Sequence, residues 1–209
     1  RIVQVRTGTL QLAIDLQGGD IVEIALSKHL EKLDNPNQPF VLLEQNEQRT
    51  YIAQSGLIGP SGIDKGKRAQ FSSAASNYTL SGGEESLQVD LSWNDGSGLN
   101  ITKRFTFQRD SYVVDVDYLI DNGSSERFQA NLFGQIKRDN SADPAASSSG
   151  MGMVPFLGAA VTQPDDRFTK FSFEDMQEEP FKAQLPGGWV AMIQHYFLSA
   201  WIPNPDQSH

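Results

Sequence analysis

The residues that most often carry out chemistry are sparse in this chain. Its 209 residues include no cysteine and three histidines, so a thiol nucleophile, an iron–sulfur cluster and a thiolate zinc site are excluded. No two histidines have the HExxH spacing of a helical zinc site, and no serine stands in a G-x-S-x-G elbow. Gly150 and Gly152 are followed by Pro155, where a dinucleotide-binding loop needs its third glycine. The sequence therefore predicts no catalytic residue, no metal ligand and no cofactor site.

Paired carboxylates are a remaining route to catalysis. Asp115 and Asp117 are two residues apart on a predicted strand, about 6.6 to 6.8 Å from each other by strand rise, a separation that glycoside hydrolysis uses. Alternation with Val114 and Val116 places them on the outer face, where solvated acidic pairs are the rule. His195 lies in an apolar segment that favours a hydrogen-bonded structural imidazole. Its combination with Asp115 or Asp117 leaves open a carbohydrate-binding or mutarotase-like site.

The charge balance argues against nucleic acid as a partner. The chain has 17 Lys and Arg against 26 Asp and Glu, a formal net charge of −9, whereas binding to phosphate backbones depends on Lys and Arg. Lys65, Lys67 and Arg68 form the one basic cluster, in a Gly- and Ser-rich stretch. We expect this cluster to be inert, with an anionic partner or lipid headgroups left open as its ligand.

The elements that must position these side chains are strands, because apolar residues recur with a period of two. Gly, Asn and Asp separate these segments and predict turns. In the segment at 99–108, Lys103 interrupts the row of inward-facing apolar residues. The best pattern of apolar residues at helical spacing covers only residues 27–33. Short connections in the second half predict an antiparallel meander of four strands within an all-β sandwich. The predicted strands are residues 9–16, 20–27, 86–93, 99–108, 112–120 and 127–136.

Two stretches interrupt the strands, at residues 55–70 and 139–152, and both are predicted to be flexible loops. Because strand periodicity resumes on both sides of each, we expect a single domain over residues 1–209. The longest apolar run, residues 151–161, is shorter than the roughly 20 residues that a membrane-spanning helix needs. The chain begins at Arg1 without an initiator Met, and we expect it to derive from a longer protein.

The last apolar segment, residues 187–203, differs from the others because both its odd-numbered and its even-numbered positions are mostly apolar. This pattern predicts an internal strand pair, or one long bent strand, that is covered on both faces. The predicted core joins this segment to the inward rows of the earlier strands. Its members are Leu12, Ile14, Leu91, Trp93, Phe105, Phe107, Trp189, Phe197 and Trp201.

Five strings in chain order resemble the large periplasmic domain of the YidC family, the membrane protein insertases of Gram-negative bacteria. The similarity runs over nearly the whole chain, and the last string is the most specific. The strings are LQLAIDLQGGDI at 10–21, QSGLIG at 54–59, TKRFTFQRDSYVVDVDYLIDN at 102–122, LFGQIKR at 132–138 and GGWVAMIQHYFLSAWIP at 187–203.

The resemblance implies a β-supersandwich of two packed, mostly antiparallel sheets, with long loops and little helix, similar to aldose-mutarotase and sugar-binding folds. It also implies a setting on the periplasmic side of the inner membrane, between the first and second membrane spans of the insertase. The family's domain continues with further strands and a helical linker, so we expect the sandwich to be truncated at its C-terminal end.

The leading functional hypothesis is a noncatalytic interaction domain accessory to insertion. Its implied partners are SecD and SecF of the Sec translocon, nascent membrane-protein clients and the membrane region of the insertase. Contacts are expected in Gln135–Pro186, since long excursions from a rigid scaffold often carry binding. A carbohydrate-binding domain and a chaperone-like cleft for extended peptides are the alternatives. The predicted partner surface comprises Met151, Met153, Val154, Phe156, Leu157, Phe168 and Phe171.

Overall fold

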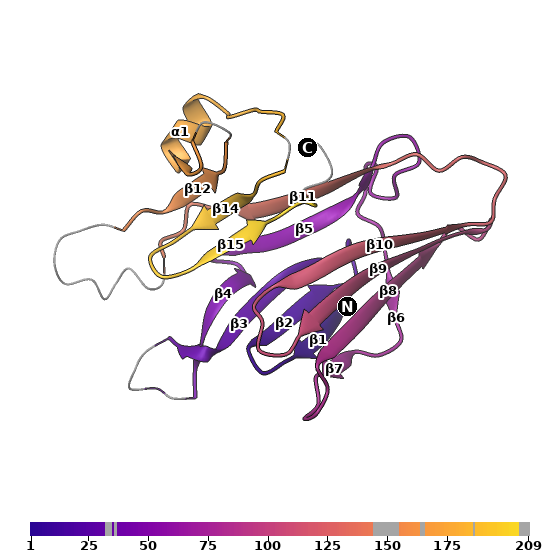
Figure 1. The fold of residues 1–209 in the computed structure, drawn as a ribbon, viewed down its shortest axis with the longest axis horizontal. Coiled ribbons are helices and arrows are strands. Elements are labelled where there is room, and N and C mark those ends of the chain that lie inside the picture. The colour runs from indigo at the N-terminus through magenta and orange to yellow at the C-terminus, as the bar shows by residue number, and fades with distance from the viewer. Residues whose placement is uncertain (32–34, 36, 144–154, 164–165, 186, 205–209) are drawn as a thin grey trace. The chain divides into compact units, whose positions relative to one another are not determined.

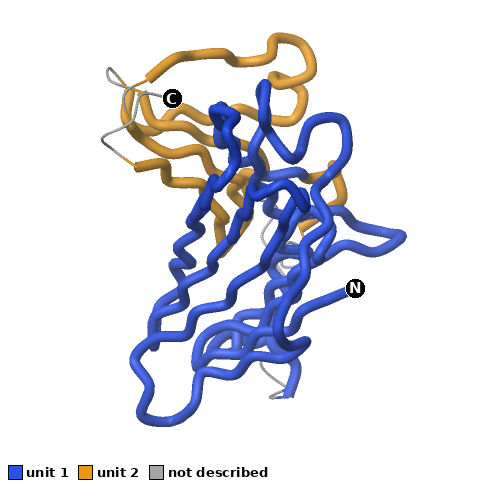
Figure 2. Tube along the Cα trace, turned by 90° about the vertical axis from the view of Figure 1, so that its right-hand side faces the viewer, with its two compact units in different colours: residues 1–137 blue, residues 138–209 orange. Residues whose placement is uncertain are grey.

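The structure is a computed structural model that describes residues 1–31, 35, 37–143, 155–163, 166–185 and 187–204. The regular elements of the described residues are all strands except one short helix, which confirms the predicted all-β class (Figure 1). Their contacts divide the chain into two compact units, unit 1 at Arg1–Lys137 and unit 2 at Arg138–His209 (Figure 2). The sequence gives no sign of this division, because strand periodicity is present in both units.

The larger sheet of unit 1 has seven strands in the order β11-β5-β4-β3-β2-β1-β7. Successive strands from β1 to β5 pair antiparallel, whereas β7 runs parallel to β1. The predicted hairpin of β2 and β3 is confirmed, and Gly18 and Gly19 occupy its turn with φ values of 84° and 61°. The strands are β1 (Ile2–Arg6), β2 (Leu10–Asp15), β3 (Asp20–Leu30), β4 (Pro39–Gln45), β5 (Thr50–Ile58), β7 (Asn77–Thr79) and β11 (Asn131–Arg138).

The second sheet of unit 1 has four strands in the order β10-β9-β8-β6 and is antiparallel throughout. The β8–β9 turn is held by Asp95, whose carboxylate accepts from the backbone N–H of Ser97 at 2.8 Å and of Leu99 at 3.0 Å. Hydrogen bonds from Ser97 hold the pKa of Asp95 below its ordinary value. The strands are β6 (Ser72–Ser73), β8 (Ser86–Asn94), β9 (Leu99–Gln108) and β10 (Val114–Asn122).

The two sheets of unit 1 pack face to face, and alternate side chains are buried most regularly on β1 and β9. On β9, Ile101, Lys103, Phe105 and Phe107 are all buried, as the period of two predicts. Truncating a buried phenylalanine of this kind costs about 3–5 kcal/mol. Of the predicted core in this unit, Trp93 is only half-buried. The others, Leu12, Ile14, Leu91, Phe105 and Phe107, are at most 1% exposed.

Three sequence predictions for unit 1 are wrong in detail. The fourth strand of the predicted meander, β11, belongs to the seven-stranded sheet beside β5. The connection before it is bonded to the loop after β5, with Ser61 N–H donating to Gln129 O at 2.9 Å and Gln129 N–H donating to Ser61 Oγ at 3.1 Å. These bonds bring the chain across to β5. In addition, β5 continues to Ile58 into the stretch predicted as a loop, and β3 continues to Leu30 into the predicted helical stripe.

Unit 2 contains an antiparallel sheet in the order β13-β12-β14-β15 and the helix α1. The helix begins after a capping box, in which Ser172 Oγ accepts from Asp175 N–H and the Asp175 carboxylate accepts from Ser172 N–H. These hydrogen bonds lower the pKa of Asp175. The elements are β12 (Gly158–Val161), β13 (Thr169–Ser172), α1 (Phe173–Glu178), β14 (Val190–Ile193) and β15 (Leu198–Trp201).

The last apolar segment forms the predicted strand pair, β14 with β15, but its two faces are not both covered. Val190 is 40% exposed and Leu198 is 55% exposed, and β15 lies at the edge of its sheet. The four strands here have four residues each, and α1 buries none of its side chains, so these elements provide little covering surface. Three residues predicted to be core, Trp189, Phe197 and Trp201, are accordingly half-buried.

Candidate functional site

Lys103 lies at the centre of the most unusual polar arrangement in the described residues. It extends from the inward face of β9 toward the seven-stranded sheet, and its side chain has no exposed surface. Its Nζ donates to the backbone carbonyl of Gly18 at 3.0 Å and to that of Ser55 at 3.1 Å. Lys103 therefore hydrogen-bonds the two sheets of unit 1 to each other through their interior.

Arg68 enters the same region from the loop between β5 and β6. Its guanidinium forms ion pairs with Asp20 at the start of β3 and with Asp64, whose Oδ1 is 2.8 Å from Nη1. It also donates to the Gly18 carbonyl at 3.1 Å and to the Ser55 carbonyl at 2.8 Å. Arg68 and Lys103 thus share two backbone acceptors. We call Asp20, Asp64, Arg68 and Lys103 the buried ionic cluster.

The carboxylates of the buried ionic cluster are fully engaged by neutral groups as well. Asp64 Oδ2 accepts from Leu57 N–H at 2.9 Å, and its Oδ1 accepts from Ala69 N–H at 3.1 Å. Asp20 Oδ2 accepts from Gln54 Nε2 at 2.7 Å. Both carboxylates are almost without exposed surface. Buried charges need such partners, because an unpaired one costs several kcal/mol.

Glycines create the space that the two long cations occupy. A Cβ on Gly19 would lie 2.8 Å from Lys103 Cδ, and one on Gly18 would lie 2.5 Å from Arg68 Nε. A Cβ on Gly56 would collide with Asp64 Oδ2 and would lie 2.6 Å from Arg68 Nη1. In the sequence Gly18-Gly19-Asp20, the two glycines therefore form the turn and leave space for the Lys103 and Arg68 side chains. Asp20 provides a negative charge for these cations.

Aromatic rings complete the surroundings. Lys103 Nζ lies 5.4 Å from the ring centroids of both Phe105 and Tyr118, and Arg68 Cζ lies 5.3 Å from that of Phe133. Tyr118 on β10 hydrogen-bonds Ser55 Oγ at 3.2 Å. Burial raises the pKa of Tyr118 well above its ordinary value, so its hydroxyl stays protonated. Rings facing a cation provide attraction without a competing negative charge.

Burial has the opposite effect on the amine. Desolvation lowers the pKa of Lys103 from 10.5 to about 7, since it penalises the charged form. Asp20 and Asp64 act to raise this pKa and Arg68 acts to lower it, and burial is the largest of the effects. Lys103 therefore titrates close to neutral pH although it lies among carboxylates.

The buried ionic cluster has no solvent-exposed reactive atom with which to act on a substrate. Its lysine and both carboxylates are buried, and each makes hydrogen bonds inside the protein. A shallow cavity of about 360 Å³ in unit 1 is lined by other residues, among them Arg1, Leu16 and Ser73 to Ser76. The chemistry available to the cluster is holding the sheets together and binding or releasing a proton.

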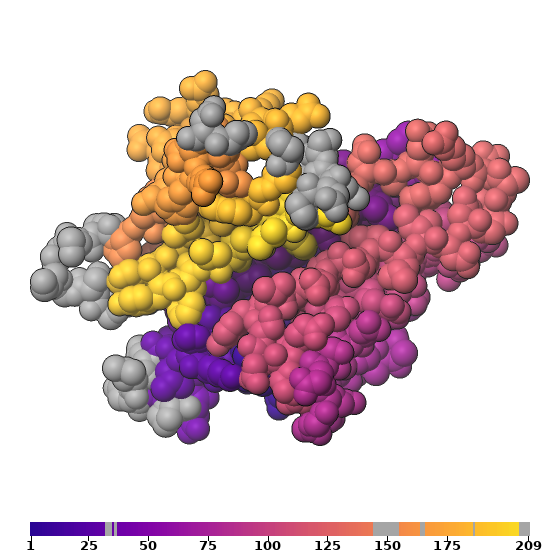
Figure 3. Space-filling view, in the orientation of Figure 1, coloured from indigo at the N-terminus to yellow at the C-terminus, as the bar shows by residue number. Residues whose placement is uncertain are grey.

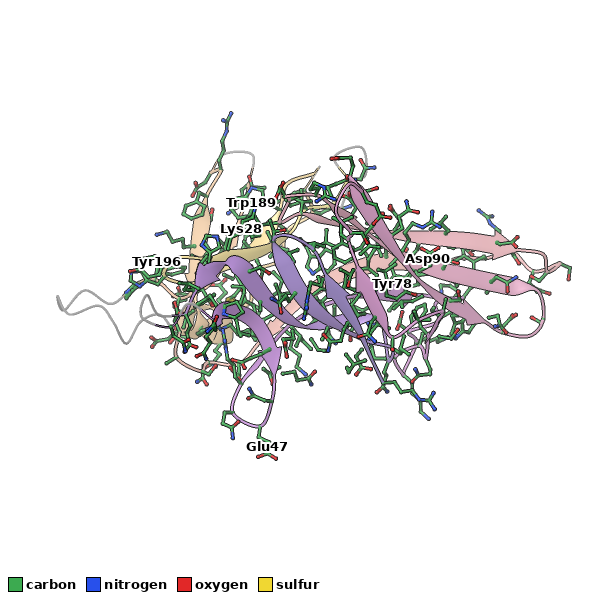
Figure 4. The ribbon with its side chains drawn as sticks, turned by 90° about the horizontal axis from the view of Figure 1, so that it is seen from below. Lys28, Glu47, Tyr78, Asp90, Trp189 and Tyr196 are labelled. Atoms are coloured by element: carbon green, nitrogen blue, oxygen red, sulfur yellow. The ribbon has the colours of Figure 1, made fainter. Side chains whose placement is uncertain are left out.

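The carboxylates predicted as a possible acid pair lie elsewhere in unit 1. Asp115 and Asp117 are exposed on the outer face of β10, as predicted. Asp117 is opposite Arg104 in the register of β9 and β10, and Arg104 forms a two-pronged ion pair with Asp90 at 2.7 and 2.8 Å (Figure 4 labels Asp90). The hydrogen bonds from Arg104 hold the pKa of Asp90 below its ordinary value. This row of alternating charge is typical of a solvated sheet face.

The third member of the sugar-site alternative, His195, belongs to unit 2. Its backbone N–H donates to Asp143 Oδ2 at 2.8 Å, and its ring stacks on that of Tyr196 with centroids 3.9 Å apart. Tyr196, between β14 and β15, is 66% exposed (Figure 4). The His195 ring Nδ1 is buried without a hydrogen-bond partner among the described residues, so the predicted hydrogen-bonded imidazole is wrong at this nitrogen. The contacts of His195 provide no support for sugar chemistry. In the part of the chain that the structure describes, no His, Asp and Glu side chains gather in a group able to hold a metal ion.

The predicted partner surface is only partly described. Met151, Met153 and Val154 lie outside the described residues. Phe168 is 49% exposed, whereas Phe156, Leu157 and Phe171 are half-buried. Lys170 Nζ lies 5.0 Å from the Phe156 ring and 5.5 Å from the Phe168 ring, and Phe168 contacts Trp189 with centroids 6.0 Å apart. An aromatic group capped by one cation therefore lies on unit 2.

Sequence reasoning missed the buried ionic cluster and misread one of its members. The sequence predicts that Arg68 belongs with Lys65 and Lys67 to an inert basic cluster. In the structure Lys65 and Lys67 are exposed, whereas the Arg68 side chain reaches the interior. One signal was available, because Lys103 interrupts an inward apolar row and a buried lysine requires partners. Period and composition alone could not identify those partners, which lie up to 85 residues away in the chain.

Four of the five strings that carry the family resemblance contribute residues in or around this cluster, whereas Asp64 and Arg68 lie outside the strings. The four strings contain Gly18 to Asp20, Ser55 and Gly56, Lys103, Tyr118 and Phe133. The family model described as the YidC periplasmic domain matches residues 2–209. The chain belongs to the YidC periplasmic domain family.

Relatives named membrane protein insertase YidC agree with this membership. The chain is 47% identical to the protein of Saccharophagus degradans and 44% identical to that of Pseudomonas aeruginosa, with 100% of the chain covered in both cases. It is 45% identical to the protein of Cellvibrio japonicus over 97% of the chain. It spans only 36% to 40% of the length of these three relatives. In the described residues, no helix has the length and apolar character needed to cross a membrane.

Proposed function

We propose that this chain is a noncatalytic recognition domain of a membrane protein insertase, located on the periplasmic side of the inner membrane. In this role it is accessory to the insertion and folding of inner-membrane proteins, and it contacts SecD and SecF of the Sec translocon. The partners rest on the family resemblance. The noncatalytic role is supported by the buried ionic cluster, whose lysine and carboxylates are buried and hydrogen-bonded inside the protein.

The observation that carries the recognition role is the apolar surface of unit 2. Large apolar side chains stay exposed there, and the hairpin of β14 and β15 forms part of the outer surface (Figure 3). Exposed apolar groups gathered on one region mark sites of protein contact. The exposed residues are Phe168, Phe181, Val190, Tyr196, Leu198 and Ile202.

The test is capture of purified SecD and SecF by the 209-residue chain. Phe168→Ser should reduce capture several-fold, because interface energy concentrates in a few aromatic anchors. Leu119→Ser, at an exposed apolar position on β10 of unit 1, is the matched control and should retain capture. Circular dichroism of both variants verifies folding. Equal capture by the two folded variants contradicts the assignment of the contact to Gln135–Pro186, and the absence of capture by the unaltered chain contradicts the Sec partnership.

A second candidate, a chaperone-like site for extended peptides, is favoured by the position of β15. This strand is at the edge of its sheet and carries the exposed Leu198. Sheet edges can accept an extended peptide as an additional strand. Suppression of the aggregation of an unfolded client by the chain, lost in an Ala200→Pro variant that removes a backbone N–H from the outer edge of β15, supports this candidate. Unchanged aggregation in the presence of the chain contradicts it.

A further inference from the structure

The hydrogen bonds of Lys103 match a neutral amine. An ammonium group carries three N–H donors, and a neutral amine carries two. Within the described residues, Lys103 Nζ has two acceptors, the carbonyls of Gly18 and Ser55. Both acceptors are uncharged, and the side chain is completely buried. A third N–H at this position would have no carbonyl acceptor among the described residues, and the rings of Phe105 and Tyr118 would attract its charge without accepting a conventional hydrogen bond.

The titratable groups around Lys103 come from three parts of unit 1. Asp20 lies on β3, Asp64 and Arg68 lie between β5 and β6, and Tyr118 faces the amine from β10. Arg68 forms direct ion pairs with the carboxylates of Asp20 and Asp64. Lys103 instead binds the two carbonyls that Arg68 also binds. The carboxylates still attract a proton to the amine, while Arg68 and burial oppose it, so neither protonation state is overwhelmingly favoured.

We propose that Lys103 is a proton-responsive contact between the two sheets of unit 1: the neutral amine closes the sandwich, and protonation weakens it. In the protonated state the amine carries a full charge and a third N–H in a site built around two acceptors. Separation of the sheets lets water solvate that charge. A fall in pH from 9 to about 7 therefore favours opening of unit 1, and pH values of 8 to 9 favour the closed sandwich.

The sign follows from proton counting. The pKa of Lys103 is about 7 in the folded chain, against 10.5 for an ordinary lysine. Between these values the unfolded chain binds more protons, so stability rises with pH across that window. A folded-state pKa that is lowered thus gives a loss of stability as pH falls. For one proton the unfolding equilibrium constant falls roughly 50-fold between pH 7 and pH 9.

Chemical denaturation of the 209-residue chain from pH 6 to pH 9 tests this proposal. Relative to Lys103→Met, which cannot titrate, the unaltered chain should show the roughly 50-fold fall in unfolding constant between pH 7 and pH 9. Lys137→Met, which alters an exposed lysine on β11, should keep the pH profile of the unaltered chain. Identical profiles for the unaltered chain and Lys103→Met overturn the proposal.

A second measurement serves if Lys103→Met does not fold. Carbon-13 NMR of the unaltered chain, with lysine labelled at Cε, follows each amine through its own titration. The proposal requires one Cε resonance with a midpoint close to pH 7. If every lysine resonance titrates above pH 9.5, Lys103 is permanently charged in the folded chain and the proposal is wrong. A purely structural role for Lys103 predicts no resonance that titrates near neutrality.

Discussion

Units 1 and 2 differ in where their charged side chains lie. Unit 1 buries two carboxylates, a lysine and most of an arginine inside a sandwich, and eight large apolar side chains are exposed among its described residues, against six among those of the shorter unit 2. Unit 2 has a small sheet whose strands leave large apolar side chains exposed. The interior charges of unit 1 bond its strands and loops to one another, and exposed apolar groups give unit 2 a surface suited to contact. The difference suggests that one unit is the scaffold and the other the recognition surface.

The largest expected effect is the loss of Arg68. Arg68→Ala leaves Asp20 and Asp64 buried without their cation, and breaking a buried ion pair in this way costs about 3–5 kcal/mol. The free energy of unfolding, measured by urea denaturation, should fall by that amount. Arg104→Ala is the matched control, because its pair with Asp90 is partly solvated and is worth about 0.2–1 kcal/mol. Similar losses in both variants would remove the distinction between interior and surface charges.

Much of unit 1 could be predicted from the sequence, since alternation alone places Leu12, Leu91 and Phe105 in the core. Alternation cannot reveal which sheet a strand joins, and β11 was assigned to the wrong sheet because hydrogen bonds near Ser61 redirect the chain. The buried ionic cluster was beyond prediction for a related reason. Its members belong to distant segments, and Arg68 is indistinguishable from its loop neighbours until its partners are in place.

An intermediate effect is expected when a glycine beside the cluster is filled. Gly56→Ala places a Cβ against Asp64, Arg68 and Phe133, and overpacking of this kind costs about 1–3 kcal/mol. Gly82→Ala is the matched control, because no heavy atom lies within 4 Å of the added Cβ. Thermal unfolding should show a clearly lower Tm for Gly56→Ala than for Gly82→Ala. Equal Tm values would mean that the cluster is more loosely packed than the distances indicate.

The smallest effect concerns unit 2. Ser172→Ala removes the capping box of α1, and the loss of such a cap costs about 1 kcal/mol. Because α1 buries no side chain, the loss should stay local and appear as faster amide exchange in residues 173–178. Ser92→Ala, an exposed serine on β8, should leave that exchange unchanged. Faster exchange throughout unit 1 in Ser172→Ala would contradict the independence of the two units.

Hydrogen exchange of the 209-residue chain with and without purified SecD and SecF tests the division of roles most directly. We expect added protection in peptides from residues 166–203 of unit 2. Peptides that contain Asp20, Ser55 and Lys103 should exchange at the same rate in both samples. Protection confined to the latter peptides, with none in unit 2, would show that the partner engages the sandwich and would contradict the assignment of recognition to unit 2.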